Sequence, residues 1–175
     1  MRKWTHIANI QAELSHCVAR MVMLHGGVTG EGIDDTLVSA FIQMGGLHTI
    51  YHALVSFAAS TEVQTNGMLA LANLCGNFEA ASSQQAAKRF VFDWEGVPLV
   101  TKAMTNFPEE ELVQENGCWL LNNLCRAGGD QEAAVIKSQA LMVVAASVQH
   151  FSKNANIEKD AHDLMNAVLS GDKKP

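Results

Sequence analysis

A phrase that occurs twice constrains the fold of this chain more than any other feature of its sequence. The pattern V-Q-x-N-G-x-x-x-L-x-N-L-C runs over residues 63–75 and again, fifty positions later, over residues 113–125. Gly46-Leu47 and Gly96-Val97 are separated by the same fifty positions, so a whole block recurs. Self-similarity at a fixed period of about this size is typical of proteins built from stacked units. We therefore predict an array of similar units.

A third, shorter block follows, in which Leu141 aligns with Val97 and Val168 with Leu124, each pair forty-four positions apart. Apolar residues recur at helical spacings of three and four, and no segment alternates apolar and polar residues as a strand would. The sequence predicts one all-α domain over residues 1–175. Its expected parts are an N-terminal helix over 3–25, units over 33–76, 82–126 and 130–170, and a polar tail over 171–175.

Capping residues mark several expected helix boundaries. Ser60 or Thr61 can cap the long helix of the first unit, because a hydroxyl oxygen accepts hydrogen bonds from the unpaired amides of a first turn. Gly76 is expected to end that helix. Asp130 is expected to cap the first helix of the last unit. Gly67 and Gly117 fall inside helices, where each costs about 1 kcal/mol relative to Ala, so we expect close helix packing there.

The balance of charge limits the partners. Twelve basic and eighteen acidic residues give a formal net charge of −6, without a clustered basic run. Nucleic acid is not expected as a partner, because phosphate binding needs a concentrated basic surface. No secretory signal is recognisable, and the longest apolar run, Ala140 to Val148, is far shorter than the ~20 residues of a membrane span. We expect a cytoplasmic or nuclear protein without membrane insertion.

The residues that carry reaction chemistry form no recognisable motif. His48 and His52 have a spacing that can chelate a metal, yet no third ligand accompanies them, and we interpret the pair as solvated surface. We find no nucleophile elbow, phosphate loop or paired carboxylates. The sequence therefore predicts no catalysis, no metal and no cofactor. Four cysteines lie in apolar helical patterns without CxxC spacing, and we interpret them as reduced core thiols: Cys17, Cys75, Cys118 and Cys125.

A unit of two helices, a glycine corner and a third helix ending in L-x-N-L-C resembles the armadillo repeat. The resemblance covers residues 3–170 and implies a right-handed α-solenoid of about three repeats plus one N-terminal helix. Gly45, Gly46 and Gly96 match the family's corner, whereas Gln139-Ala140 departs from it. The period of fifty exceeds the usual ~40–47 residues, which implies extra loop over 26–32 and 77–82.

The resemblance also implies where a partner binds. In the importin-α and β-catenin members, the third helices line a concave groove that holds a protein segment or an extended peptide. Importin-α places Trp and Asn four residues apart there, so that the amide can bond a peptide backbone and the indole can support a Lys or Arg stem. The matching candidate positions for peptide or protein binding are Asn66, Leu69, Asn73, Asn116, Trp119 and Asn123.

Other interpretations stay open. Trp119 can be a packing residue, and Asn123 can hydrogen-bond a neighbouring helix. Leu69 stands where a second Trp would be needed, so a nuclear-import receptor is not expected. The chain can also be a structural module that self-associates through its end units to form a homo-oligomer, or a fragment of a larger armadillo-containing protein.

Overall fold

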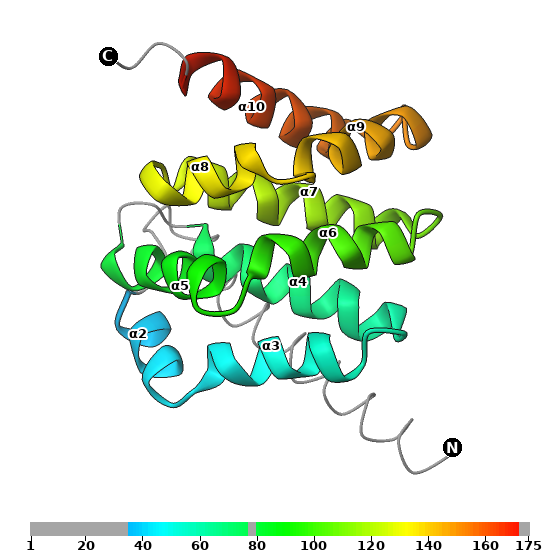
Figure 1. Ribbon diagram of the computed structural model, residues 1–175. Coiled ribbons are helices and arrows are strands. Elements are labelled where there is room, and N and C mark those ends of the chain that lie inside the picture. The colour runs from blue at the N-terminus through cyan, green and yellow to red at the C-terminus, as the bar shows by residue number, and fades with distance from the viewer. Residues whose placement is uncertain (1–34, 77–79, 172–175) are drawn as a thin grey trace, which may run out of the picture.

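The computed structural model describes residues 35–76 and 80–171 (Figure 1). The helix expected over 3–25, and residues 172–175 of the expected tail, lie outside these ranges. Within them all regular structure is helical and there is no strand, which confirms the expected all-α class. In the same two ranges, no helix combines the length and the apolar character needed to cross a membrane.

The helices form three triplets, and the third helix of each triplet is the longest. The first triplet is α2 (Asp35–Gln43), α3 (Gly46–Ser56) and α4 (Thr61–Cys75). The second is α5 (Ala81–Phe92), α6 (Gly96–Asn106) and α7 (Glu111–Arg126). The third is α8 (Gly129–Lys137), α9 (Ala140–His150) and α10 (Ala155–Gly171).

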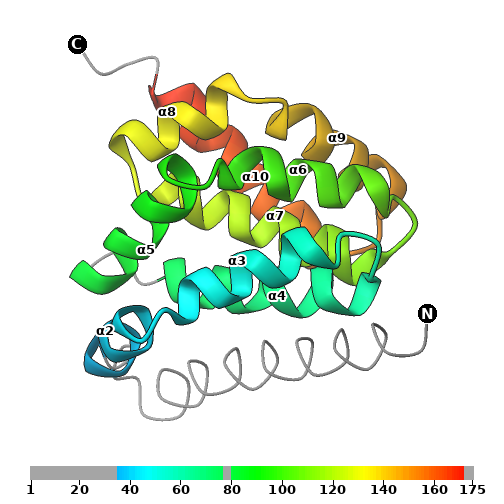
Figure 2. The ribbon, with the colours of Figure 1, turned by 60° about the horizontal axis from the view of Figure 1, so that its bottom comes forward.

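Counterpart helices of neighbouring triplets lie against each other. α2 contacts α5, α5 contacts α8, and α6 contacts α9. The long helices α4, α7 and α10 contact one another in that order, and we call them the third-helix layer. Figures 1 and 2 show the triplets in succession, with α2 to α4 at one end and α8 to α10 at the other. One apolar cluster extends through all three triplets, so each triplet buries its faces against its neighbours.

A buried glutamine connects the second and third helices in each of the first two triplets. Gln64 donates from Nε2 to the backbone oxygens of Leu54, at 2.9 Å, and Phe57, at 3.2 Å. Gln114 makes the equivalent two bonds, both 2.8 Å, at the end of α6. Carbonyls at a helix C-terminus lack partners in their own helix. The glutamine of the repeated phrase therefore supplies a hydrogen-bond donor to the carbonyls at the C-terminus of the preceding helix.

The glycines of the repeated phrase allow the same two helices to approach closely. A Cβ on Gly67 would lie 2.6 Å from Cδ2 of Leu54 in α3. A Cβ on Gly117 would lie 2.6 Å from Sδ of Met104 in α6. Both distances are shorter than a van der Waals contact, which explains why the phrase accepts the low helix propensity of glycine.

The corner between the first and second helices uses a left-handed residue followed by a glycine. Gly45 has a φ of +80° and Glu95 a φ of +52°. The next residue is Gly46 or Gly96, where a Cβ would lie within 2.4 Å of a phenylalanine ring. The last corner differs because Gln139 has a φ of −78°, in line with the departure of the sequence there.

Two of the expected caps are present and one prediction is wrong. The Ser60 hydroxyl accepts from the Val63 amide at 3.4 Å and caps α4, and Gly76 follows the last residue of α4. Asp130 is not the cap of α8, because Gly128 takes the N-cap position and the helix begins at Gly129. Asp130 instead lies in the first turn, where the helix dipole favours a carboxylate.

Candidate functional site

The six residues expected to bind a peptide lie on two adjacent helices of the third-helix layer. Asn66, Leu69 and Asn73 belong to α4, and Asn116, Trp119 and Asn123 belong to α7. Each residue of the second set follows its counterpart by fifty positions, and α4 packs directly against α7. The structure therefore brings the two sets together as equivalent positions of two stacked units.

The amide donors of three asparagines are used inside the layer. Asn123 donates from Nδ2 to the Ala72 backbone oxygen at 2.9 Å, and Asn116 donates to the Thr65 oxygen at 3.1 Å. Asn73 donates to the Leu69 oxygen of its own helix at 3.0 Å. Asn123 is only 3% exposed. The interhelical hydrogen bond, which was the alternative interpretation of Asn123, is thus present.

The other members of the set are more accessible. Leu69 and Trp119 are half-buried and pack against the edge of the core. Asn66 is also half-buried and has interactions of its own. On α7, Trp119 lies between the two interhelical amides in sequence, three residues after Asn116 and four before Asn123. The accessible part of the expected site is therefore aromatic and apolar, and the buried amides hold its two helices together.

A hollow of about 310 Å³ lies beside Trp119, between α7 and α10. Besides the indole, it is lined by Glu115 of α7 and by Asn156, Lys159 and Asp160 of α10. Sequence reasoning missed these four residues. Glu115 and Trp119 are one helical turn apart, which places them on the same face of α7. That spacing could have identified Glu115, whereas the α10 residues depend on how the last triplet stacks.

Hydrogen bonds orient the two carboxylates of this hollow. Glu115 accepts one bond from Asn154 and one from Asn156, both at 2.9 Å. Asp160 accepts a bond from Asn122 Nδ2 at 2.9 Å. Burial raises the pKa of Asp160, while the bond from Asn122 and the nearby Lys159 ammonium act in the opposite direction. The ionised Asp160 carboxylate is therefore incompletely compensated, and a cation entering the hollow would stabilise it.

The thiols of the three cysteines in the described ranges are not activated, while Cys17 lies outside these ranges. Burial raises the pKa of Cys75 and of Cys118 to about 12, and that of Cys125 to about 11. A thiol with such a pKa is protonated at neutral pH and is a poor nucleophile or metal ligand. All three thiols are free and buried, as expected of core residues.

The histidine pair lies on the surface of α3. His48 and His52 are exposed, and their Nε2 atoms are 3.0 Å apart. Across residues 35–76 and 80–171, no group of three or more His, Cys, Asp and Glu side chains is arranged to hold a metal ion. Tyr51 of the same helix stacks on Trp94, with ring centroids 5.1 Å apart.

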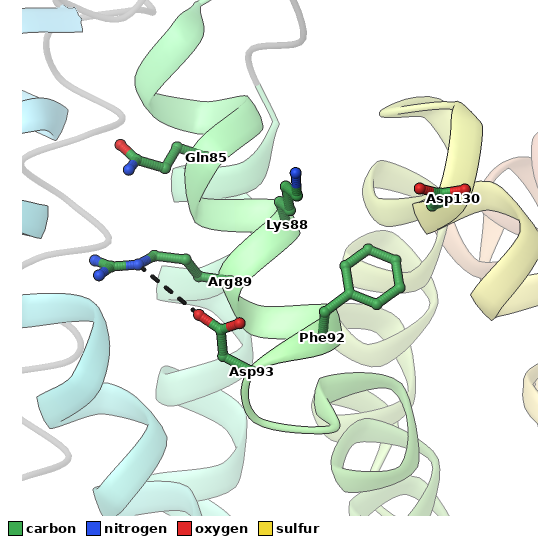
Figure 3. A pocket seen from close by; sticks show the side chains of 6 residues that line it. All are labelled: Gln85, Lys88, Arg89, Phe92, Asp93 and Asp130. Carbon is green, nitrogen blue, oxygen red and sulfur yellow. Dashed lines mark ion pairs between the residues drawn. The ribbon is translucent and has the colours of Figure 1, made fainter.

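A second hollow, of about 330 Å³, lies beside α5 and the start of α8. Figure 3 shows that its side chains do not converge: Arg89 and Phe92 extend in opposite directions, and Asp130 lies on the separate helix α8. Arg89 and Asp93 form an ion pair of 4.0 Å between two exposed side chains. We therefore take the hollow beside Trp119, where an aromatic ring and carboxylates meet, as the candidate site.

Comparison of the chain with family models, with curated proteins and with solved structures gave no match. Together, the described residues define an all-helical protein of three stacked helix triplets with a polar and aromatic hollow on its third-helix layer.

Proposed function

We propose that this chain is an α-solenoid of armadillo-like repeats that binds an extended segment of a partner protein along its third-helix layer, without catalysis. In this proposal a Lys or Arg side chain of the partner enters the hollow beside Trp119. The observation that supports it is the meeting of one indole with the carboxylates of Glu115 and Asp160 in that hollow.

The chemistry of the hollow favours a cation. Two carboxylates face a single ammonium group, that of Lys159. An indole face attracts Lys or Arg by about 0.5–1 kcal/mol at exposed sites and more when water is excluded. A guanidinium or ammonium also forms charge-assisted hydrogen bonds with carboxylates. The net charge of −6 adds a long-range attraction for a basic partner.

The spacing of the layer favours an extended segment. Packed helices lie ~10 Å apart, which equals the length of about three residues of extended chain at ~3.3 Å each. Leu69 of α4 and Trp119 of α7 occupy equivalent positions of the repeated phrase. A segment that crosses both helices therefore meets an apolar surface first and the cation-binding hollow next.

The interhelical amides have a supporting role in this proposal. Asn116 and Asn123 tie α7 to α4 on either side of Trp119 in the sequence. They fix the position of the indole, and their donors are not needed by the partner. This differs from an importin-like groove, where such amides bond the peptide itself.

Fluorescence polarisation of labelled peptides tests the proposal. The probe is an extended peptide of alternating lysine and alanine, and its glutamate counterpart is the reference. We expect the lysine peptide to bind more tightly, and we expect Trp119→Ala or Glu115→Gln to weaken its binding about tenfold or more, which is a loss of about 1.4 kcal/mol or more. Trp119→Phe should retain part of the affinity.

Trp94→Ala is the matched control, because Trp94 is also half-buried but stacks on Tyr51 away from the hollow. It should leave binding of the lysine peptide unchanged, and circular dichroism should show the same helix content in all variants. Equal affinity for the lysine and glutamate peptides, or equal affinity of Trp119→Ala and the parent chain, would refute the proposed site.

A further inference from the structure

The outer face of the last triplet carries an apolar hollow of about 320 Å³ between α9 and α10. This face lies at the end of the stack opposite α2 and α3 (Figure 1). Glu158 and His162 of α10 contribute the polar groups of the hollow. We call this surface the end face; its apolar lining is Leu141, Val144, Ala145 and Val148 of α9, and Ala161, Leu164 and Met165 of α10.

The end face corresponds to a surface that is covered in the preceding triplet. α7 begins at Glu111 and α10 at Ala155, so equivalent positions differ by forty-four. His162, Met165 and Leu169 are therefore equivalent to three α7 residues that are at most 2% exposed: Cys118, Leu121 and Cys125. In contrast, Met165 is 55% and Leu169 is 65% exposed.

On α7, this surface contacts the next triplet. α7 packs against both α9 and α10, and Asn122 of α7 donates a hydrogen bond to Asp160 of α10. Because α10 repeats α7, its equivalent surface has the shape and composition that receive another set of helices. Exposed apolar surface of this kind marks an interaction site.

The polar groups of the end face indicate which helices it receives. The Asn166 amide nitrogen lies 3.1 Å from Nδ1 of His162. His162 is exposed, and an imidazole N–H can donate a hydrogen bond to a partner. Glu158, one turn earlier, is exposed and its carboxylate can only accept. One helix therefore displays a donor and an acceptor four residues apart, with the small Ala161 between them.

We propose that a second copy of this chain docks on the end face, with the two α10 helices antiparallel about a two-fold axis near Ala161. A two-fold axis between positions 158 and 162 brings each Glu158 to His162 of the other copy, which makes the contact self-complementary. The small side chain of Ala161 lets the helices approach. Met165 of each copy then enters the hollow between α9 and α10 of the other.

Sedimentation velocity over a range of concentrations tests this proposal on the full chain. We expect a reversible dimer whose dissociation constant rises about tenfold or more in Met165→Glu, because the substitution buries a carboxylate in the hollow. Met142→Glu is the matched control: Met142 is a 76% exposed methionine of α9 that does not line the hollow. It should dimerise like the parent chain.

Oxidative cross-linking tests the two-fold arrangement separately. Ala161→Cys places two thiols near the axis, and we expect a disulfide-linked dimer on a non-reducing gel. The same experiment with Met142→Cys should leave the chain monomeric on the gel. A monomer at every concentration, a dimer insensitive to Met165→Glu, or no cross-link through Ala161→Cys would each overturn the proposal.

Discussion

Asn123 of α7 donates a hydrogen bond to the backbone oxygen of Ala72 in α4, over 2.9 Å and across the interface between two neighbouring triplets. Ala72 lies in the last turn of α4, where the amide of Gly76 bonds Asn73 instead. The Asn123 side chain thus takes the place of a missing intrahelical donor. One asparagine of the repeated phrase therefore joins the C-terminal ends of α4 and α7, the third helices of two neighbouring units.

We expect Asn123→Ala to lower the free energy of unfolding by about 1–3 kcal/mol, because a buried carbonyl is left without its donor. Asn116→Ala should cost less, since the Thr65 carbonyl lies in the interior of α4, where a helix supplies its own donor. Urea denaturation of both variants measures the difference. An equal loss in the two variants would contradict this account of the interface.

The two glycines of the repeated phrase should respond differently to alanine. Ala gains about 1 kcal/mol in helix propensity, whereas overpacking costs typically 1–3 kcal/mol. At Gly117 the new methyl meets Met104, whose unbranched chain can adjust. At Gly67 it meets the buried, branched Leu54. Gly67→Ala should therefore be less stable than Gly117→Ala by about 1 kcal/mol in thermal or urea unfolding, and the reverse order would disprove the argument.

Gly45 and Glu95, the left-handed residues of the first two corners, allow a pair of opposite substitutions. A non-glycine residue in the left-handed conformation costs about 1–2 kcal/mol. Glycine avoids this cost, but it loses more conformational entropy on folding, which offsets part of the gain. Glu95→Gly should therefore raise the unfolding free energy by up to about 1 kcal/mol. Gly45→Ala should lower it, although the new Cβ would meet no described atom within 4 Å. Differential scanning calorimetry should show shifts of opposite sign, and shifts of the same sign would rule out a backbone origin.

Asp160 links stability to pH. Burial raises the pKa of Asp160 in the folded state, so its ionised carboxylate destabilises the fold. This destabilisation is absent below the unfolded pKa of about 3.9 and grows as the pH rises through the folded pKa. Asp160→Asn removes this destabilisation. Its amide can also donate to Asn122 Oδ1, a buried oxygen that has no partner among the described residues.

The stability gained by Asp160→Asn should therefore increase from acidic to neutral pH, as measured by urea denaturation at several pH values. The same variant should bind the lysine peptide more weakly, because the hollow loses a negative charge. A stability difference that does not change with pH would contradict the role given to burial of this carboxylate.

The repeated phrase allowed the helices of the described units and several of their boundaries to be predicted. Apolar spacing and the Ser60 cap are local features, so they can be read without knowing the tertiary structure. The left-handed conformation of Glu95 could not be predicted, because this conformation is typical of glycine and no local pattern marks a glutamate for it. The start of α8 was missed since Gly128 and Gly129, both with positive φ, turn the chain into the helix before Asp130.

The candidate site was predicted only in part. The phrase placed Trp119 beside its partner helix, but the direction of the Asn123 amide depends on how α7 is rotated against α4. The role of Gln114 was also missed, because its acceptors lie at the end of another helix. The hollow beside Trp119 is lined in part by Asp160. Asp160 belongs to the third unit, which does not contain the repeated phrase, so the phrase could not place it.

The most direct test of the proposed function is the indole N–H resonance of each tryptophan in a ¹H–¹⁵N spectrum during titration with the lysine peptide. Trp119→Phe and Trp94→Phe assign two of the three tryptophan signals, and the third belongs to Trp4. We predict that the Trp119 resonance shifts in a saturable manner, while that of Trp94 stays in place. Saturable binding of the peptide with an unmoved Trp119 resonance would contradict the proposal that the third-helix layer is the binding surface.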